Sequence, residues 1–158
     1  MLTHTGPCAC AFTTGIPIYE SKAKVIPEGS VDPWTMLKVS ADEDFIDALG
    51  IELVAGRNFS RHIPSDSSKA VLLNETAVRR LGWQIGGVDP EKDALGKTFT
   101  LLDGGRRVHV VGVVKDYHIG TLREPIKPAF LKIRKNRHLL VRIRPERVPE
   151  TMAFLKET

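Results

Sequence analysis

Apolar residues along the chain fall into short runs, and several of these runs alternate with polar residues at a period of two. Such runs are typical of β-strands with one or both faces buried. The most apolar of them, 108–114, is rich in valine and predicts a core strand. The pattern as a whole predicts strands at 34–39, 51–54, 70–73, 98–102, 108–114, 129–133 and 138–143, with shorter candidates at 8–12 and 22–26.

Three helices are predicted where apolar residues recur at helical spacing next to a capping residue. One is expected to start at Asp42 and stop at Gly50, and another runs from Asn74 to Gly82. A third opens at Pro149, because proline is favoured in the first turn of a helix. The turn signal Asp-Gly-Gly at 103–105 joins the strands at 98–102 and 108–114 into a hairpin.

The order of these elements predicts an α+β fold. Strands and helices are mixed, without the regular strand–helix alternation of a doubly wound sheet. The polar stretch 62–69, which contains Pro64, predicts a boundary between two lobes. No internal repeat and no low-complexity tract is found.

Composition indicates a globular chain of one domain or two small lobes. The 158 residues are 42% hydrophobic and 27% charged, and the net charge is +4. No run approaches the roughly 18 apolar residues of a membrane span, and the first residues lack the pattern of a signal peptide. Because the two ends resemble interrupted elements, we expect the sequence to be a segment of a longer membrane protein.

The two cysteines, Cys8 and Cys10, point to the same side of the predicted first strand. Their Cα atoms would lie about 7 Å apart, which is the upper limit for a disulfide. We therefore expect two free thiols, and the cysteines do not indicate a redox compartment.

The common catalytic and ligand-binding motifs are absent, so no enzyme, cofactor or metal is expected. Leu95-Gly96-Lys97-Thr98 lacks the earlier glycine of a phosphate-binding loop and has Glu91 in its place. The histidines and cysteines lack zinc-binding spacing, and no serine occupies a nucleophile elbow.

Asp116 follows the core strand and is expected to cap a turn. The alternative is a small hydrolase or isomerase in which Asp116 acts as a general base with Tyr117 or His118. No partner nucleophile with a specific signal accompanies it.

Cations are concentrated near the end of the chain, where they alternate with apolar residues on two predicted strands. Alternation places the cations on one sheet face, which is expected to be a solvated outer face. The alternatives are a docking surface for an acidic protein patch, or a nucleic-acid-binding face. The lack of exposed aromatic residues weakens the nucleic-acid alternative, and no nucleic acid is expected as a partner. The candidates for partner contact are Arg134, Arg137, Arg142 and Arg144.

Six short motifs occur in an order that resembles the periplasmic core domain of MacB-like ABC-transporter permeases, within the MacB/FtsX/LolC-type permease superfamily. They lie at 13–17, 45–59, 71–81, 95–97, 110–117 and 121–128. The motif residues to which this resemblance gives a structural role are Gly56, Arg57, Asn74, Gly96, Gly112, Asp116 and Pro125.

The resemblance implies a non-catalytic domain on the periplasmic side of the inner membrane, placed between two transmembrane helices. It implies a porter-like α+β lobe built from 1–66 and 137–158, with an inserted mixed α/β lobe at 67–136. The expected partners are an ABC ATPase, reached through the membrane part, and a periplasmic adaptor or cargo. The domain would relay ATP-driven motion in export, lipoprotein release or envelope signalling. The isolated domain is expected to be a monomer or a weak dimer.

Overall fold

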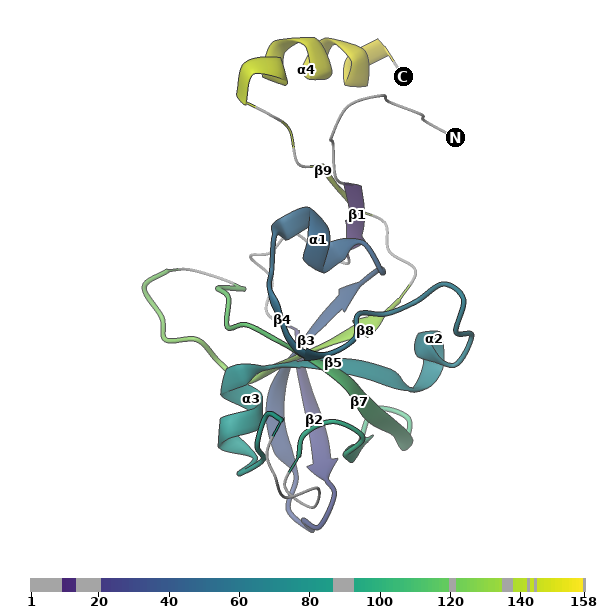
Figure 1. The fold of residues 1–158 in the computed structure, drawn as a ribbon, viewed down its shortest axis with the longest axis vertical. Helices are drawn as coiled ribbons and strands as arrows, with labels where there is room; N and C mark the ends of the chain where they lie inside the picture. Colours follow the sequence, from purple (N-terminus) through teal and green to yellow (C-terminus); the bar gives the residue numbers. More distant parts are fainter. Residues whose placement is uncertain are drawn as a thin grey trace.

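The computed structural model describes residues 10–13, 21–86, 93–119, 122–134, 138–141, 143 and 145–157. In Figure 1, strands cross at the centre of the body with helices around them, and the last helix of the chain lies apart from the body. The elements are β1 (Cys10–Thr13), β2 (Lys22–Pro27), β3 (Trp34–Ala41), α1 (Phe45–Leu49), β4 (Leu53–Gly56), α2 (Asp66–Lys69), β5 (Ala70–Asn74), α3 (Glu75–Arg80), β6 (Thr98–Leu101), β7 (Arg106–Val114), β8 (Ala129–Ile133), β9 (His138–Val141), the 3-10 turn η1 (Pro145–Arg147) and α4 (Val148–Glu157).

The central sheet closes on itself as a six-stranded barrel. Its strands follow the order β2-β6-β7-β5-β8-β3, and β3 then pairs with β2 through an antiparallel ladder that sets Val25 opposite Trp34. The pairs β3–β8 and β5–β7 are parallel, and the other four pairs are antiparallel. Closure leaves neither β2 nor β3 as a free sheet edge, so their backbone groups are paired within the barrel.

All six barrel strands contribute side chains to one buried apolar cluster. Phe99 and Phe130 meet in it edge to face, with ring centroids 5.5 Å apart. Ala77 and Val78 of α3 join the same cluster, so α3 covers one end of the barrel with apolar surface. The strand residues of this interior core are Ala23, Val25, Met36, Val71, Leu73, Phe99, Leu101, Val108, Val110, Val113 and Phe130.

A second apolar cluster covers the outside of the barrel. Phe45 and Ile46 of α1, together with Phe59, pack against Leu72 of β5 and Leu131 of β8. β5 is buried at all five positions, because its alternate residues belong to the two clusters. This explains why the sequence shows β5 as a continuous apolar run without alternation.

β1 and β9 form a separate antiparallel ladder on one side of the barrel. It runs from Cys10 opposite Val141 to Thr13 opposite His138. In the described part of the chain, β1 pairs with β3 at Thr13 opposite Ala41. Figure 1 shows this ladder between the barrel and α4, so the first and last described strands leave the barrel together.

The α+β class predicted from the sequence is confirmed, and most predicted elements lie within one or two residues of the observed ones. Two of these elements were placed wrongly. The first helix begins at Phe45 with Asp44 as its N-cap residue, not at Asp42. The strand expected at 51–54 is shifted to Leu53–Gly56, where its backbone can pair with β7. The polar stretch 62–69 contains the helical turn α2, which buries Asp66.

The two-lobe division stays a prediction. Hydrogen bonds join β2 and β3 to β6 and β8, so the barrel combines strands from both predicted lobes. Cys8 lies outside the described residues, and Cys10 begins β1.

Two glycines allow β4 to approach β7 closely. Gly56 pairs with Gly112 in the register of these strands, and a bulge in β7 precedes Gly112 in its ladder with β5. A Cβ atom on Gly112 would overlap the carbonyl oxygen of Arg57 and lie 3.0 Å from Cδ2 of Leu72. A Cβ atom on Gly56, whose φ is 74°, would overlap the carbonyl oxygen of Val111. Both positions therefore require glycine for space.

Gly112→Ala is expected to lower the free energy of unfolding by about 3 kcal/mol, because backbone atoms of two strands would have to separate. Gly82→Ala is the matched control. Gly82 has φ 72°, but a Cβ atom on it would meet open space, so alanine there should cost only about 1 kcal/mol of backbone strain. Urea unfolding followed by circular dichroism measures both values. Equal losses in the two variants would contradict the close approach.

Candidate functional site

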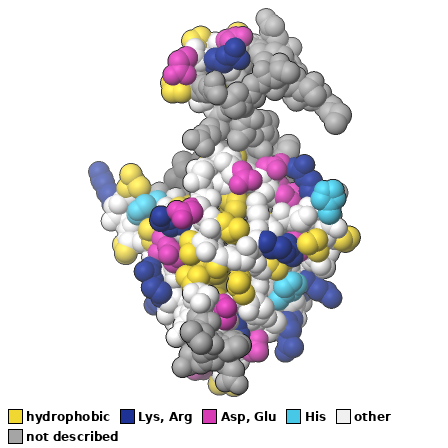
Figure 2. All heavy atoms as spheres, in the orientation of Figure 1, with side chains coloured by type: hydrophobic (Ala, Val, Ile, Leu, Met, Phe, Trp, Pro, Cys, Tyr) yellow, Lys and Arg dark blue, Asp and Glu magenta, His cyan; other side chains and the backbone are white. Residues whose placement is uncertain are grey.

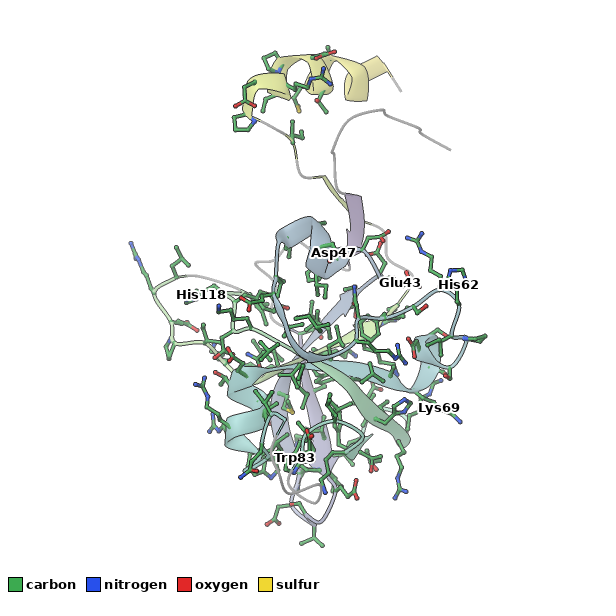
Figure 3. All side chains as sticks on the ribbon, viewed as in Figure 1. Glu43, Asp47, His62, Lys69, Trp83 and His118 are labelled. Atoms are coloured by element: carbon green, nitrogen blue, oxygen red, sulfur yellow. The ribbon has the colours of Figure 1, made fainter. Side chains whose placement is uncertain are left out.

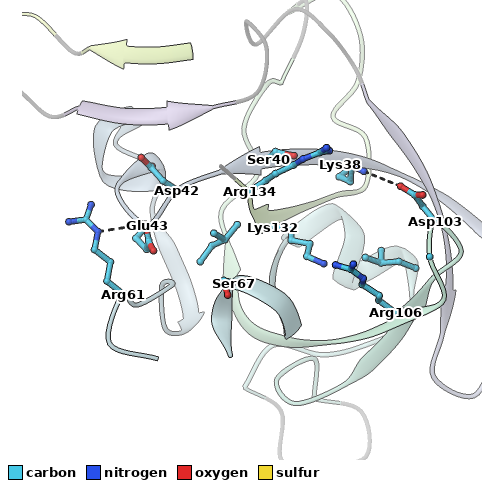
Figure 4. Close-up of a pocket in the computed structure, with 13 residues that line it drawn as sticks. Lys38, Ser40, Asp42, Glu43, Arg61, Ser67, Asp103, Arg106, Lys132 and Arg134 are labelled. Carbon is cyan, nitrogen blue, oxygen red and sulfur yellow. Dashed lines mark ion pairs between the residues drawn. The ribbon is translucent and has the colours of Figure 1, made fainter. Parts of the chain in front are cut away.

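A pocket of about 1020 Å³ opens at the end of the barrel opposite α3. It lies where β3 and β8 end and where β7 begins, beside the turn between β6 and β7 and next to α2 (Figure 4). The residues that line it are Lys38, Ser40, Asp42, Glu43, Arg61, Ser67, Leu101, Asp103, Gly104, Arg106, Lys132, Ile133 and Arg134.

The pocket is polar because the inward-facing positions of the strands change character toward this end. On β3, Met36 lies in the interior core, and Lys38 and Ser40 follow at the next alternate positions. On β8, Phe130 is in the core and Lys132 follows two residues later. Ser40 is paired with Lys132 in the β3–β8 register, so their side chains share one face. The barrel interior therefore passes from an apolar core into a cationic mouth.

The pocket separates into a cationic part and a mixed part. Figure 4 shows Arg106 and Lys132 converging on one side, with Glu43 and Arg61 on the other. Arg61 Nε lies 3.7 Å from Glu43 Oε2, and Arg61 also pairs with Asp44. Arg61 balances only one of these two carboxylates, and Asp42 also lines the pocket, so the mixed part keeps an excess of negative charge.

Burial lowers the pKa of Lys132, and the nearby positive charges of Arg106 and Lys38 lower it further. Lys38 has one carboxylate within reach, because its Nζ lies 3.6 Å from Asp103 Oδ2. Asp103 is itself 85% exposed, so water screens its attraction strongly. Lys132 therefore lies partly buried beside two other cations, and the carboxylate nearest to Lys38 is at the exposed rim.

Of the predicted partner-contact residues, Arg134 lines this pocket. Arg137, Arg142 and Arg144 lie outside the described residues. Sequence reasoning missed Lys38 and Arg106, since both lie on strands far along the chain from the basic run. Their signal was the change from apolar to charged residues at alternate strand positions. On the face seen in Figure 2, the other lysines and arginines are spread around the body.

The motif residue Arg57 anchors the loop that carries Phe59. Its guanidinium donates to both carboxylate oxygens of Asp66, over 2.6 and 2.9 Å, and the Ser60 backbone N–H donates to Asp66 Oδ2. The Asp66 side chain is 1% exposed, whereas Arg57 is 42% exposed. The bond from Arg57 holds the pKa of Asp66 below its usual value, although burial opposes this.

Asn74 links three segments from a fully buried position. Its Oδ1 accepts from the N–H of Ala77, which confirms the predicted helix cap, and also from the N–H of Ala129. Its Nδ2 donates to the carbonyl of Lys127. The side chain therefore fastens the start of α3 to the segment that leads into β8.

Asp116 caps a helix and does not face the pocket. Its Oδ1 accepts from the Thr76 N–H over 2.8 Å, and its Oδ2 accepts from the Thr76 hydroxyl and from Arg79. The sequence predicted a turn cap, and the capped element is the first turn of α3. These bonds occupy both carboxylate oxygens, as expected of a structural carboxylate.

The neighbours of Asp116 also lack the arrangement of a catalytic site. Burial raises the pKa of Tyr117, whose hydroxyl has no hydrogen-bond partner among the described residues. In Figure 3, His118 lies on the opposite side of the body from Glu43 and His62. Among the described residues, the Asp116 carboxylate accepts hydrogen bonds from Thr76 and Arg79, which serve to hold α3.

The remaining motif residues have simpler roles. Gly96 has φ 81°, and its N–H donates to the carbonyl of Val110, so it turns the chain into β6. Pro125 is exposed in the segment before β8. Over the described residues, no group of His, Cys, Asp and Glu side chains could hold a metal ion. No helix in the same part of the chain is long and apolar enough to cross a membrane.

Replacing Asp66 with asparagine is expected to lower the free energy of unfolding at pH 7 by about 2 kcal/mol, because a charged hydrogen-bond pair is lost. The pKa of Asp66 is lower in the folded state than in the unfolded state. The stability that its carboxylate contributes is therefore fully present above pH of about 4, and it disappears as the pH falls through the folded-state pKa. The two proteins should therefore converge in stability at low pH. Asp32→Asn, at an exposed turn position, is the control and should differ little from the parent at any pH. A constant difference between parent and Asp66→Asn across the acid range would contradict the assignment.

Comparison with known proteins identifies the family. The model of the MacB-like periplasmic core domain matches residues 14–154. None of the curated proteins compared with the chain matches it.

Three solved structures share the fold. A domain of a putative permease from Porphyromonas gingivalis is 20% identical, with a TM-score of 0.60 over 96% of this chain and 68% of that one. The periplasmic region of MacB from Actinobacillus actinomycetemcomitans is 16% identical, with a TM-score of 0.58 over 94% and 65%. The extracellular domain of the noncanonic ABC-type transporter YknZ from Gram-positive bacteria is 13% identical, with a TM-score of 0.59 over 90% and 68%. With the family match over 14–154, they show that the chain belongs to the MacB-like periplasmic core domains of bacterial ABC-transporter permeases.

Proposed function

We propose that this domain relays ATP-driven motion from the membrane part of an ABC-transporter permease to a periplasmic partner or cargo. Permeases of this family work with ATPase subunits, and the family is not catalytic in its periplasmic domain. The energy would therefore come from an ATPase on the other side of the membrane. The output would be export, lipoprotein release or signalling in the cell envelope.

The observation that carries the proposal is a closed barrel joined to the antiparallel ladder of β1 and β9. Closure joins six strands into one hydrogen-bonded ring around a filled core, so the barrel resists deformation. β1 and β9 leave it as one ladder, in which β1 pairs with β3 at Thr13 opposite Ala41. A displacement applied to this ladder would move the barrel as a rigid body through the contacts of β1 with β3 and α1.

The isolated domain would be a monomer or a weak dimer, because its main apolar clusters face the barrel interior and the α1 side of the sheet, where they are already covered. The engagement of Asp116 with α3 supports a structural role for this residue, so the hydrolase alternative has no observation in its favour.

Spin labels in the whole permease, assembled with its ATPase in lipid nanodiscs, test the relay. Arg80→Cys on α3 and Asp103→Cys at the pocket rim place two exposed labels on one barrel, after Cys8 and Cys10 are replaced by serine. The distance between these two labels should stay constant when ATP is added. The distance from either label to one in the membrane part should change by several ångströms. No change in any distance during ATP hydrolysis would reject the relay, and a change within the barrel would reject rigid-body motion.

A further inference from the structure

The cationic part of the pocket holds more positive charge than its protein surroundings balance. Neither Arg106 nor Lys132 makes an ion pair with any residue that the structure describes, and Lys38 has only the exposed Asp103. The three cations come from three strands, β7, β8 and β3, and converge on one cavity. Such a cluster is an electrostatic cost to the fold unless a ligand supplies anions.

The floor and walls of the pocket favour carboxylates over a single bound phosphate. A tight phosphate site usually has several backbone N–H groups aimed at one point, as at the start of a long helix. Here the donors are long side chains around a wide opening, and the adjacent helix α2 has only four residues. Flexible ammonium and guanidinium groups spread over a concave surface match several separate carboxylates along an extended segment.

The acidic residues in the same pocket narrow the choice of partner. Glu43 and Asp103 would repel a uniformly anionic polymer such as nucleic acid. A flat lipid surface would not reach the floor of a concave pocket. A protein segment can place its acidic side chains near Lys132 and Arg106 and its neutral or basic ones near Glu43.

We propose that the mouth of the barrel binds an extended acidic segment of a partner protein, with Lys132 and Arg106 as the main carboxylate contacts. The partner's role in a relay rests on the proposed function, whereas binding of the segment is a property of this domain alone. If the spin-label experiment rejects the relay, binding of an acidic peptide to this domain can still be measured, so the two proposals can be rejected independently.

The test uses the 158-residue chain and fluorescein-labelled hexaglutamate as the probe, with fluorescence anisotropy at about 50 mM salt, where such charge contacts are weakly screened. Lys132→Glu and Arg106→Glu should each weaken binding by about tenfold or more. Arg80→Glu makes the same change in net charge on α3, at the other end of the barrel, and should change the affinity less than twofold. Equal weakening by all three variants would show nonspecific attraction and overturn the proposal.

Lys132→Met separates binding from folding. Removing a half-buried cation with a lowered pKa should raise the thermal midpoint of unfolding, while the affinity for hexaglutamate falls. A variant that binds less well because it is unfolded would show the opposite shift in midpoint. Retained affinity in folded Lys132→Met and Lys132→Glu would contradict the assignment.

Two competitors distinguish other anion sources. Inorganic phosphate should displace the peptide only when its concentration of negative charge far exceeds that of the peptide carboxylates. The same is expected of vesicles of phosphatidylcholine with phosphatidylglycerol. Displacement by phosphate at equal concentration would make the pocket a simple anion site. Preferential binding to the vesicles, lost in Lys132→Glu, would make it a membrane contact, and either result would overturn the acidic-segment proposal.

Discussion

The pairing of β2 with β3 is the constraint on which the rest of the structure depends, because it closes the sheet into a barrel. Without that ladder, the six strands would form an open sheet with two exposed edges and one poorly covered face. Closure instead gives an interior that six strands fill with apolar side chains, around the edge-to-face contact of Phe99 and Phe130. It also gives the barrel two ends, of which α3 covers one with apolar residues and the other opens as the pocket.

The two ends of the barrel differ in what their residues do. At the α3 end, Asn74 and Asp116 satisfy backbone groups and fasten a helix over the core. At the open end, the inward positions of β3 and β8 carry Lys38 and Lys132, which contribute charge at the expense of favourable burial. Helix α2 borders this end, and its Asp66 is fully committed to Arg57 and Ser60. The motif residues thus hold the barrel and its loops in place, and the pocket uses other residues.

Sequence reasoning predicted the elements and the family well, because strand alternation, Asn74 at a helix start and Gly50 at a helix stop are local signals. Barrel closure was out of its reach, since it requires β2 to pair with β6 as well as with its neighbour β3. β2 and β6 are far apart in the chain, and their register has no local mark. Of the four arginines predicted to contact a partner, Arg134 lies in the described part of the chain and lines the pocket, and their role in partner contact stays a prediction. Lys38 becomes a neighbour of Lys132 through the β3–β8 ladder, and Arg106 through the curvature of the barrel, so no reading of single segments could have grouped them.

Native-state hydrogen exchange at the β2–β3 ladder tests the closed barrel most directly. In a closed barrel, the amides that bridge β2 and β3 open only with the rest of the strands, as do those between β5 and β7. Their opening free energies should therefore match the global free energy of unfolding. The contrary result is an opening free energy for the β2–β3 amides that lies several kcal/mol below the global free energy of unfolding. It would show that the sheet is open in solution, and it would contradict both the rigid relay and the formed pocket.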